Sequence, residues 1–165
     1  MGRFQLMKVF ISHQLADTAL ATWIAKRLWI YHTIDSYLDV VDPESSTKGD
    51  QLGEHIRDEL GKCDQLLAVV SQATKGSWWV PWEIGVATEK DYPIATYASD
   101  DTSLPEYLKK WPYLRNQQEL DIYARISKSA HDAYINNKRY VTEEVARKSG
   151  RRLFYRQLRQ LLGQI

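Results

Sequence analysis

The residue with the clearest chemical potential is Glu83, which follows Pro81 in the segment Trp79-Val80-Pro81-Trp82-Glu83. Pro81 suits the first turn of a helix, where its missing N–H costs no hydrogen bond. A helix N-terminus favours a charged carboxylate, and a charged carboxylate can stabilise a positive charge that develops during a reaction. An ordinary first-turn glutamate, which contributes about 0.3–1 kcal/mol through the helix dipole, explains the position equally well. Both interpretations stay open from position alone.

Three polar residues are expected at one edge of the fold. Ser12 and His13 follow a short apolar run, and Asp39 ends a second one. The carboxyl ends of parallel strands meet at one sheet edge, where doubly wound folds bind ligands. We therefore expect Ser12 and His13 just beyond the first strand, with Ser12 as a ligand contact. His13 is either a neighbour of the ligand, although not a proton donor, or a solvated loop residue. Asp39 either bonds to a ligand hydroxyl or caps the turn that begins at Asp42.

These residues need a scaffold of strands and helices in alternation. Strands are expected at residues 7–12, 35–41, 66–70, 93–98 and 120–123, with helices at 15–31, 52–60 and 81–90 between them. The run 66–70 has no polar alternation, as expected of a central strand that is covered on both faces. The predicted fold class is α/β, a flavodoxin-like, doubly wound five-stranded parallel sheet with helices on both faces and a helical C-terminal extension.

The C-terminal part is predicted to be helical and basic from about Ser129. Four apolar residues are expected on one face of its last helix: Phe154, Leu158, Leu161 and Leu162. No linker separates this part from the rest, so residues 1–128 are expected to form the main domain and residues 129–165 a helical extension packed on it.

Bulk composition excludes several classes of protein. The 165 residues are 44% hydrophobic and 26% charged, which indicates one globular core, and the net charge of +1 gives no global attraction to nucleic acid or membranes. The basic stretch 138–159 is interrupted by Glu143 and Glu144 and lacks stacking aromatics, so a solvated face or an oligomer contact is favoured over nucleic-acid binding.

A single cysteine, Cys63, and the lack of an apolar run of about 18 residues favour a cytoplasmic protein that does not span a membrane. The four histidines are far apart in sequence, so no metal site is expected.

Four segments, taken in order, resemble the TIR (Toll/interleukin-1 receptor) domain family. They are Val9-Phe10-Ile11-Ser12-His13 with Asp17, Tyr37-Leu38-Asp39 followed by Gly49, Leu66 to Ser71, and Ser77 with Trp79-Val80 and Glu83. The resemblance covers about residues 7–98. The chain resembles the stand-alone bacterial type, which is similar to the TIR component of Thoeris antiphage defence.

The resemblance implies a site and a substrate. The family contains scaffolding members and enzymes that cleave the bond between nicotinamide and ribose in NAD+. Glu83 occupies the position of the family's catalytic glutamate, and the implied substrate-binding residues are Ser12, His13, Asp39, Ser77 and Trp79. Trp79 either lines that pocket or joins Trp78 and Trp82 in a hydrophobic ledge. NAD+ would be the substrate, and no cofactor is expected.

The resemblance also implies partners. These are other copies of the chain through TIR–TIR contacts, an activating phage component, and a separate effector protein that senses the product. Whether that product is ADP-ribose, a cyclic isomer or a conjugate stays open. Gln51-Leu52 departs from the family, because some enzymatic members carry an aromatic residue there that helps to close over NAD+.

One carboxylate is enough for this chemistry because nicotinamide leaves as a neutral molecule from a positively charged ring nitrogen. The enzyme must mainly stabilise an oxocarbenium-like ribose, which a nearby ionised glutamate can do. Two alternatives remain: a non-enzymatic TIR interaction module, and a nucleoside deoxyribosyltransferase-like enzyme, which also uses a glutamate on a small α/β sheet.

Overall fold

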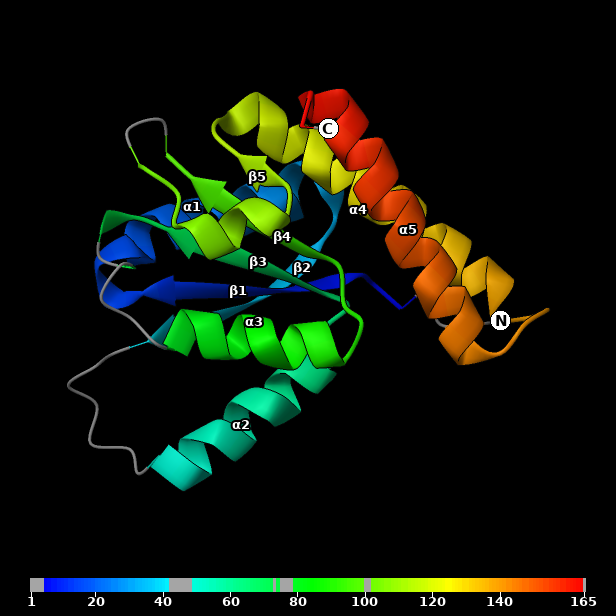
Figure 1. Ribbon diagram of the computed structural model, residues 1–165, viewed down its shortest axis with the longest axis horizontal. Coiled ribbons are helices and arrows are strands. Elements are labelled where there is room, and N and C mark those ends of the chain that lie inside the picture. Colours follow the sequence, from blue (N-terminus) through cyan, green and yellow to red (C-terminus); the bar gives the residue numbers. More distant parts are fainter. Residues whose placement is uncertain (1–4, 42–48, 73, 75–78, 100–101, 165) are drawn as a thin grey trace.

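The protein is a three-layer α/β sandwich built on one parallel sheet (Figure 1). The computed structural model describes residues 5–41, 49–72, 74, 79–99 and 102–164. The sheet has the order β2-β1-β3-β4-β5 and every pair of neighbours is parallel. Its strands are β1 (Lys8–Gln14), β2 (Asp35–Val41), β3 (Gln65–Val70), β4 (Ile94–Ala98) and β5 (Tyr113–Leu114). The predicted flavodoxin-like fold is confirmed, and the fully buried β3 is its central strand.

Helices cover both faces of the sheet, as a parallel sheet requires. They are α1 (Thr18–His32), α2 (Gly49–Gly61), α3 (Trp79–Glu89), α4 (Gln117–Asn137) and α5 (Glu143–Leu162), with 3₁₀ turns η1 (Leu15–Asp17) and η3 (Glu106–Lys110). One face of the sheet packs against α1, α4 and α5 through Val9 and Ile11 of β1. The other packs against α2 and α3 through Phe10. Adjacent residues of β1 thus serve two separate cores.

The fifth strand is not where the sequence pattern places it. It is formed by Tyr113–Leu114, whereas residues 120–123 belong to α4. Leu120, Tyr123 and Ala124 are all buried, which is a helical spacing rather than a strand alternation. The start of α4 is fixed by Asn116, whose side chain accepts a hydrogen bond from the Glu119 backbone N–H at 2.9 Å.

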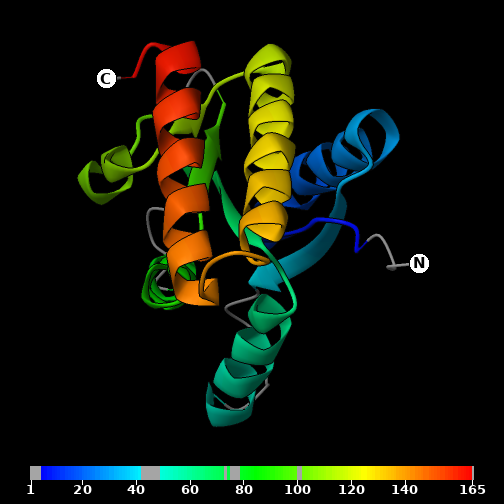
Figure 2. The same ribbon diagram turned by 90° about the vertical axis from the view of Figure 1, so that its right-hand side faces the viewer.

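The C-terminal helices begin earlier than expected and join the main core. Because α4 starts at Gln117 rather than near Ser129, a division at 128/129 falls inside this helix. Figure 2 shows α5 beside α4, and α4 beside α1. Phe154 and Leu158 of α5 are fully buried in the core that α1 and α4 share. Leu161 does not join them, because 58% of it is exposed.

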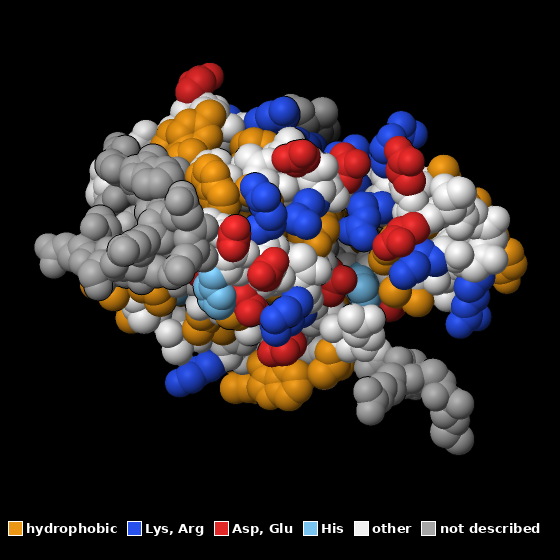
Figure 3. All heavy atoms as spheres, turned by 90° about the horizontal axis from the view of Figure 1, so that it is seen from below, with side chains coloured by type: hydrophobic (Ala, Val, Ile, Leu, Met, Phe, Trp, Pro, Cys, Tyr) orange, Lys and Arg blue, Asp and Glu red, His pale blue; other side chains and the backbone are white. Residues whose placement is uncertain are grey.

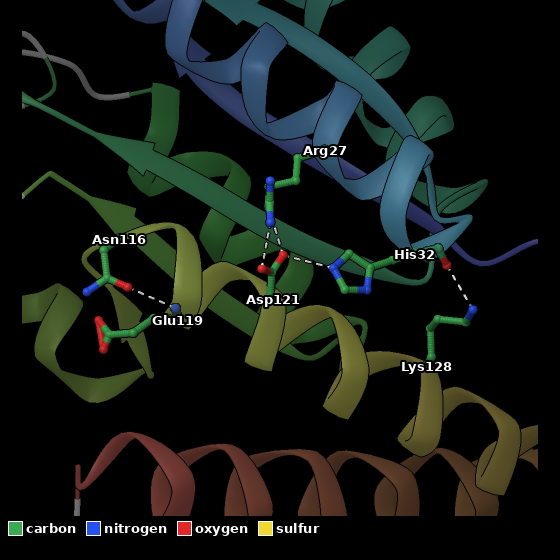
Figure 4. A network of polar contacts seen from close by, with 6 residues as sticks. All are labelled: Arg27, His32, Asn116, Glu119, Asp121 and Lys128. Carbon is green, nitrogen blue, oxygen red and sulfur yellow. Dashed lines mark hydrogen bonds and ion pairs between the residues drawn. The ribbon is translucent and has the colours of Figure 1, made fainter.

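A polar clamp ties α1 to α4 (Figure 4). Arg27 donates two hydrogen bonds to Asp121, from Nε to Oδ1 at 2.9 Å and from Nη2 to Oδ2 at 2.8 Å. His32 Nε2 lies 2.9 Å from the same Oδ1, and Lys128 Nζ donates to the His32 carbonyl at 2.8 Å. The clamp closes the sheet face that carries α1. The candidate site lies on the opposite face.

Candidate functional site

The strand register places a row of residues side by side on the sheet face covered by α2 and α3. Ser12 of β1 pairs with Asp39 of β2 and with Ala68 of β3, and Ala68 pairs with Thr96 of β4. Paired residues of neighbouring parallel strands, about 4.8 Å apart, point to the same face. Ala68 belongs to the core beneath α2 and α3, which fixes the face for the whole row. The row is polar at three of its four positions.

Glu83, in the second turn of α3, lies beside the Asp39 and Ser12 end of this row. Its side chain is completely buried, and Asp39 is only 8% exposed. Both carboxylate oxygens of Glu83, Oδ2 of Asp39 and Oγ of Ser12 have no hydrogen-bond partner in the described structure. Buried polar groups without partners are rare in folded proteins and are typical of functional sites. The sequence-predicted residues Ser12, Asp39 and Glu83 are therefore brought together.

Burial and the neighbouring Asp39 both favour the neutral form of the Glu83 side chain. Burial is the main cause that raises its pKa well above the usual value, and the neighbouring Asp39 carboxylate raises it further, while Ser12 acts in the opposite direction. Asp39 and Ser12 are close enough to change this pKa, although neither reaches hydrogen-bond geometry with Glu83. The expectation that the helix N-terminus would keep Glu83 charged is wrong. Because α3 begins at Trp79 rather than at Pro81 as expected, Glu83 lies in its second turn, where the helix dipole acts weakly, and the loss of hydration dominates.

His13 lies on the other face of the sheet from Glu83. Both Ser12 and His13 are inside β1, which continues to Gln14, and not beyond its end as expected. Successive side chains of a strand alternate between faces, so His13 points toward the α1 side with Ile11. The ring is fully buried rather than solvated, and its Nδ1 lies 3.4 Å from the Ile11 carbonyl oxygen. Burial lowers the pKa of His13, against the opposing effects of that carbonyl, Asp39 and Asp17.

Two predicted substrate contacts are not tested by the structure. Ser77 lies outside the described residues. Trp79 begins α3, but its side chain is also outside the described part. Their roles remain predictions.

Trp82 contributes to the site through packing. It packs against the core beneath α2 and α3. Its ring lies 3.9 Å from the place that a Cβ would occupy on Gly53 of α2. The residue thereby positions the first turns of α3, and Glu83 with them, against α2.

Two further residues extend the site and are missed by sequence reasoning. Thr96 ends the polar row on β4, is fully buried, and its hydroxyl has no partner in the described structure. Tyr37 precedes Asp39 by two positions, and its ring packs on Phe10 with ring centroids 5.4 Å apart. Its hydroxyl lies 3.1 Å from His55 Nε2 of α2. The signal for Thr96 is the strand register, which the sequence does not contain. Tyr37 could have been found from its period-two spacing to Asp39.

Among the described residues, the outer surface over α2 and α3 carries no field of a single sign (Figure 3). Figure 3 shows acidic and basic side chains interspersed over the described part of this face. Within the described residues there is no group of three or more His, Cys, Asp and Glu side chains that could hold a metal ion. None of the described helices is long and apolar enough to cross a membrane.

The family follows from a comparison of the whole chain with family models. The model of the TIR domain matches residues 9–134, which is well over half of the chain and includes Ser12, Asp39 and Glu83. The chain belongs to the TIR domain family. This family includes NAD+-cleaving enzymes and scaffold modules, and TIR domains commonly oligomerise through TIR–TIR contacts. No curated protein matches the chain.

Proposed function

We propose that this TIR domain cleaves the bond between nicotinamide and ribose in NAD+, with Glu83 as the carboxylate that faces the ribose. The observation that carries the proposal is the buried Glu83 beside Asp39 and Ser12, with oxygen atoms of all three side chains unpaired in the described structure. A glutamate with only a structural role would be expected to point to solvent or to be paired, since glutamate is otherwise almost never fully buried. A buried, strongly perturbed carboxyl among unpaired polar groups is instead typical of a catalytic site.

The chemistry needs Glu83 as an anion in the reacting complex. As the C1′–N bond breaks, its electron pair stays on the nicotinamide nitrogen, and the ribose becomes an oxocarbenium-like cation. The ionised Glu83 stabilises this cation electrostatically, and Asp39 and Ser12 offer hydrogen bonds to ribose hydroxyls. Attack by water at C1′ forms the C–O bond of ADP-ribose and releases the water's proton to solvent. Attack by a group of the same molecule gives a cyclic isomer instead.

Access to Glu83 requires a rearrangement. The side chain has no exposed surface in the described structure, so NAD+ cannot reach it without a shift of the first turns of α3. Such a requirement fits a signalling enzyme that stays inactive until it assembles or meets a trigger. A homo-oligomer built through TIR–TIR contacts and an activating phage component are the partners that we propose.

The biological role that we propose is the Thoeris-like one. The cytoplasmic enzyme would make an ADP-ribose-derived signal during infection, and a separate effector would sense it. Ser77 and Trp79 are proposed as additional substrate contacts on the basis of the family resemblance alone.

The experiment is the incubation of purified protein with NAD+, with and without phage lysate, and identification of the products by mass spectrometry. We expect release of nicotinamide in at least one arm and a loss of at least 100-fold for Glu83→Gln, since single electrostatic groups of this kind contribute about 10²–10³ in rate. Glu89→Gln is the matched control, because Glu89 is an exposed glutamate of the same helix. Intact NAD+ in both arms overturns the proposal.

A scaffold function is the second candidate, and the complete burial of Glu83 favours it. A carboxyl group that never meets solvent could serve only to hold α3 against the sheet. An assay on the assembled protein distinguishes the enzymatic function from the scaffold function. A scaffold would leave NAD+ intact in its oligomers, and Glu83→Gln would alter neither their size nor their partners.

A further inference from the structure

We propose that a cavity between α4, α5 and the amino ends of β3 and β4 binds a phosphate group. Its polar lining consists of Asp64, Gln65, His131, Tyr134, Arg147 and Arg151. The Gln65 side chain meets α4, so the cavity lies on the sheet face opposite to Glu83. The inference goes beyond the proposed function and does not depend on cleavage of NAD+.

The size of the cavity suits a compact polar group. Its volume is about 40 Å³. A cavity needs roughly 10–15 Å³ to hold one water molecule, and one that holds a benzene ring measures about 150 Å³. A group as large as a few water molecules therefore fits, whereas an aromatic ring does not.

A buried amide group donates into the cavity from the sheet. Gln65 is only 3% exposed, and its Oε1 accepts hydrogen bonds from the Tyr123 hydroxyl at 2.9 Å and from Ser127 Oγ at 3.1 Å. These are its side-chain hydrogen bonds in the described structure, and they leave the two N–H donors of Nε2 for a group in the cavity. A buried donor without a partner is costly, so an acceptor is expected opposite to it.

Two arginines of α5 reach the cavity from the opposite wall. The Arg147 guanidinium lies over the rings of Tyr92 and Tyr134, 5.4 Å from each centroid, and Arg151 follows one helical turn later. Gly150 lets α5 come this close to α4, because a Cβ on it would lie 3.3 Å from Tyr134 Cβ (Figure 2). A guanidinium carries five N–H donors in a fork that matches the oxygen atoms of a phosphate.

Positive charge exceeds negative charge in the lining. The two arginines face one aspartate, Asp64, whose Oδ2 already accepts a hydrogen bond from the Lys8 backbone N–H at 2.9 Å. His131 Nδ1 lies 3.8 Å from Asp64 Oδ1, which is beyond hydrogen-bond distance. The carboxylates that pair with Arg147 and Arg151 are Glu143 and Asp91, whose side chains are 62% and 35% exposed. Water screens such pairs, so they compete weakly with an anion in the cavity.

The number of donors favours a phosphate over a carboxylate. The Gln65 amide and the two guanidinium groups approach from different walls, and a phosphate group offers three strong acceptor oxygens where a carboxylate has two. Free phosphate and a phosphomonoester share this chemistry. Both arginines lie beyond Tyr134, where the family match ends, so the site is an addition that α5 makes to the matched domain.

Titration calorimetry with inorganic phosphate at constant ionic strength tests the site. We expect saturable binding of one phosphate per chain, weakened about tenfold or more in Arg147→Gln and in Arg151→Gln, because each loses charge-assisted hydrogen bonds. These side chains are 31% and 30% exposed, so the variants should fold. Arg152→Gln is the matched control, since Arg152 is an exposed arginine of the same helix that does not line the cavity. A parallel titration with glycerol 3-phosphate identifies the source: tighter binding than phosphate indicates a phosphomonoester, and equal or weaker binding indicates free phosphate.

NMR of the wild type locates the bound phosphate. The side-chain N–H signals of Gln65 should shift with the same saturation as the calorimetric signal. Absence of saturable phosphate binding in the wild type overturns the proposal, whether or not any variant folds. Binding that leaves the Gln65 signals in place, or that both arginine variants retain unchanged, overturns it as well. Phosphate binding by a protein that leaves NAD+ intact would remove only the enzymatic function.

Discussion

At the scale of single residues, the buried Glu83 should cost the protein stability. Its pKa in the folded state is raised above the ordinary value of 4.5 by burial and by Asp39. Below its unfolded pKa the group is neutral in both states and has no effect. As the pH rises from there, the unfolded chain gains stability by ionising while the folded chain does not, until the pH passes the folded pKa. The free energy of unfolding should therefore fall as the pH rises above about 4.5.

Glu83→Gln should consequently be more stable than the wild type at neutral pH. Glutamine keeps the shape and needs no ionisation, and each pKa unit of the shift corresponds to about 1.4 kcal/mol. For a chain of this size, 1 kcal/mol raises Tm by about 2–4 °C. Calorimetry at pH 4, 6 and 8 should show the gain at pH 8 and its disappearance at pH 4. Glu89→Gln should show no such gain. A Glu83→Gln protein that is less stable at pH 8 would contradict this account.

The sequence predicts which residues lie close together in the fold better than it predicts their side-chain directions and charges. Ser12, Asp39 and Glu83 are predicted at strand ends and at a helix start. The structure places them inside β1, inside β2 and in the second turn of α3, and still brings them together. The sequence pattern groups His13 with them because it ends the first strand at Ser12. The strand continues through Gln14, so alternation decides the direction of His13. The predicted charge of Glu83 is wrong for a similar reason, since helix position is visible in the sequence and burial is not.

At the scale of elements, the α1–α4 clamp should make a measurable contribution to stability. Arg27 and His32 hold the pKa of Asp121 at about 2 through hydrogen bonds and charge. Because this pKa is depressed from 3.8, the contribution is present above pH 4 and is lost as the pH falls toward 2. Asp121→Asn should lose about 1–2 kcal/mol at pH 7, a figure kept low because the pair is partly exposed to solvent.

Urea denaturation of Asp121→Asn at pH 7 and at acid pH measures this contribution. The difference from the wild type should shrink as the pH approaches 2. Asp132→Asn is the control, since Asp132 is an exposed aspartate of the same helix. Equal losses for both variants would show that the clamp has no special role.

The strength of the local pattern decides which elements can be predicted. Strand β3 is an unbroken apolar run, so its position at the centre of the sheet is predicted correctly. Strand β5 has only the residues Tyr113 and Leu114, which is too short for any alternation to appear. The sequence pattern instead favours residues 120–123, whose apolar side chains are the buried stripe of α4. Tertiary pairing with β4, rather than local sequence, makes Tyr113–Leu114 a strand.

At the scale of the whole molecule, α5 belongs to the domain although the family match ends at Tyr134. Phe154 meets Tyr123 of α4 edge to face, with ring centroids 6.1 Å apart and an angle of 84° between the rings. The Tyr155 hydroxyl accepts a hydrogen bond from the Ile94 backbone N–H at the start of β4. Gln164, beyond the end of α5, bonds both the N–H and the carbonyl of Tyr113 in β5. The last helix therefore closes the sheet face that carries α1 and α4.

Phe154→Ala should lower the stability of the entire domain rather than only detach α5. Removing a fully buried phenylalanine costs about 3–5 kcal/mol, from lost burial and from the cavity left behind. Since Phe154 shares one core with Val9 and Ile11 of β1, the loss should appear as a single cooperative transition at lower temperature. Leu161→Ala, on the exposed side of the same helix, should change stability by less than about 0.5 kcal/mol. Two separate transitions in Phe154→Ala would mean that α5 is an appendage. One transition means that the site on the opposite face is held in place by a core to which α5 contributes.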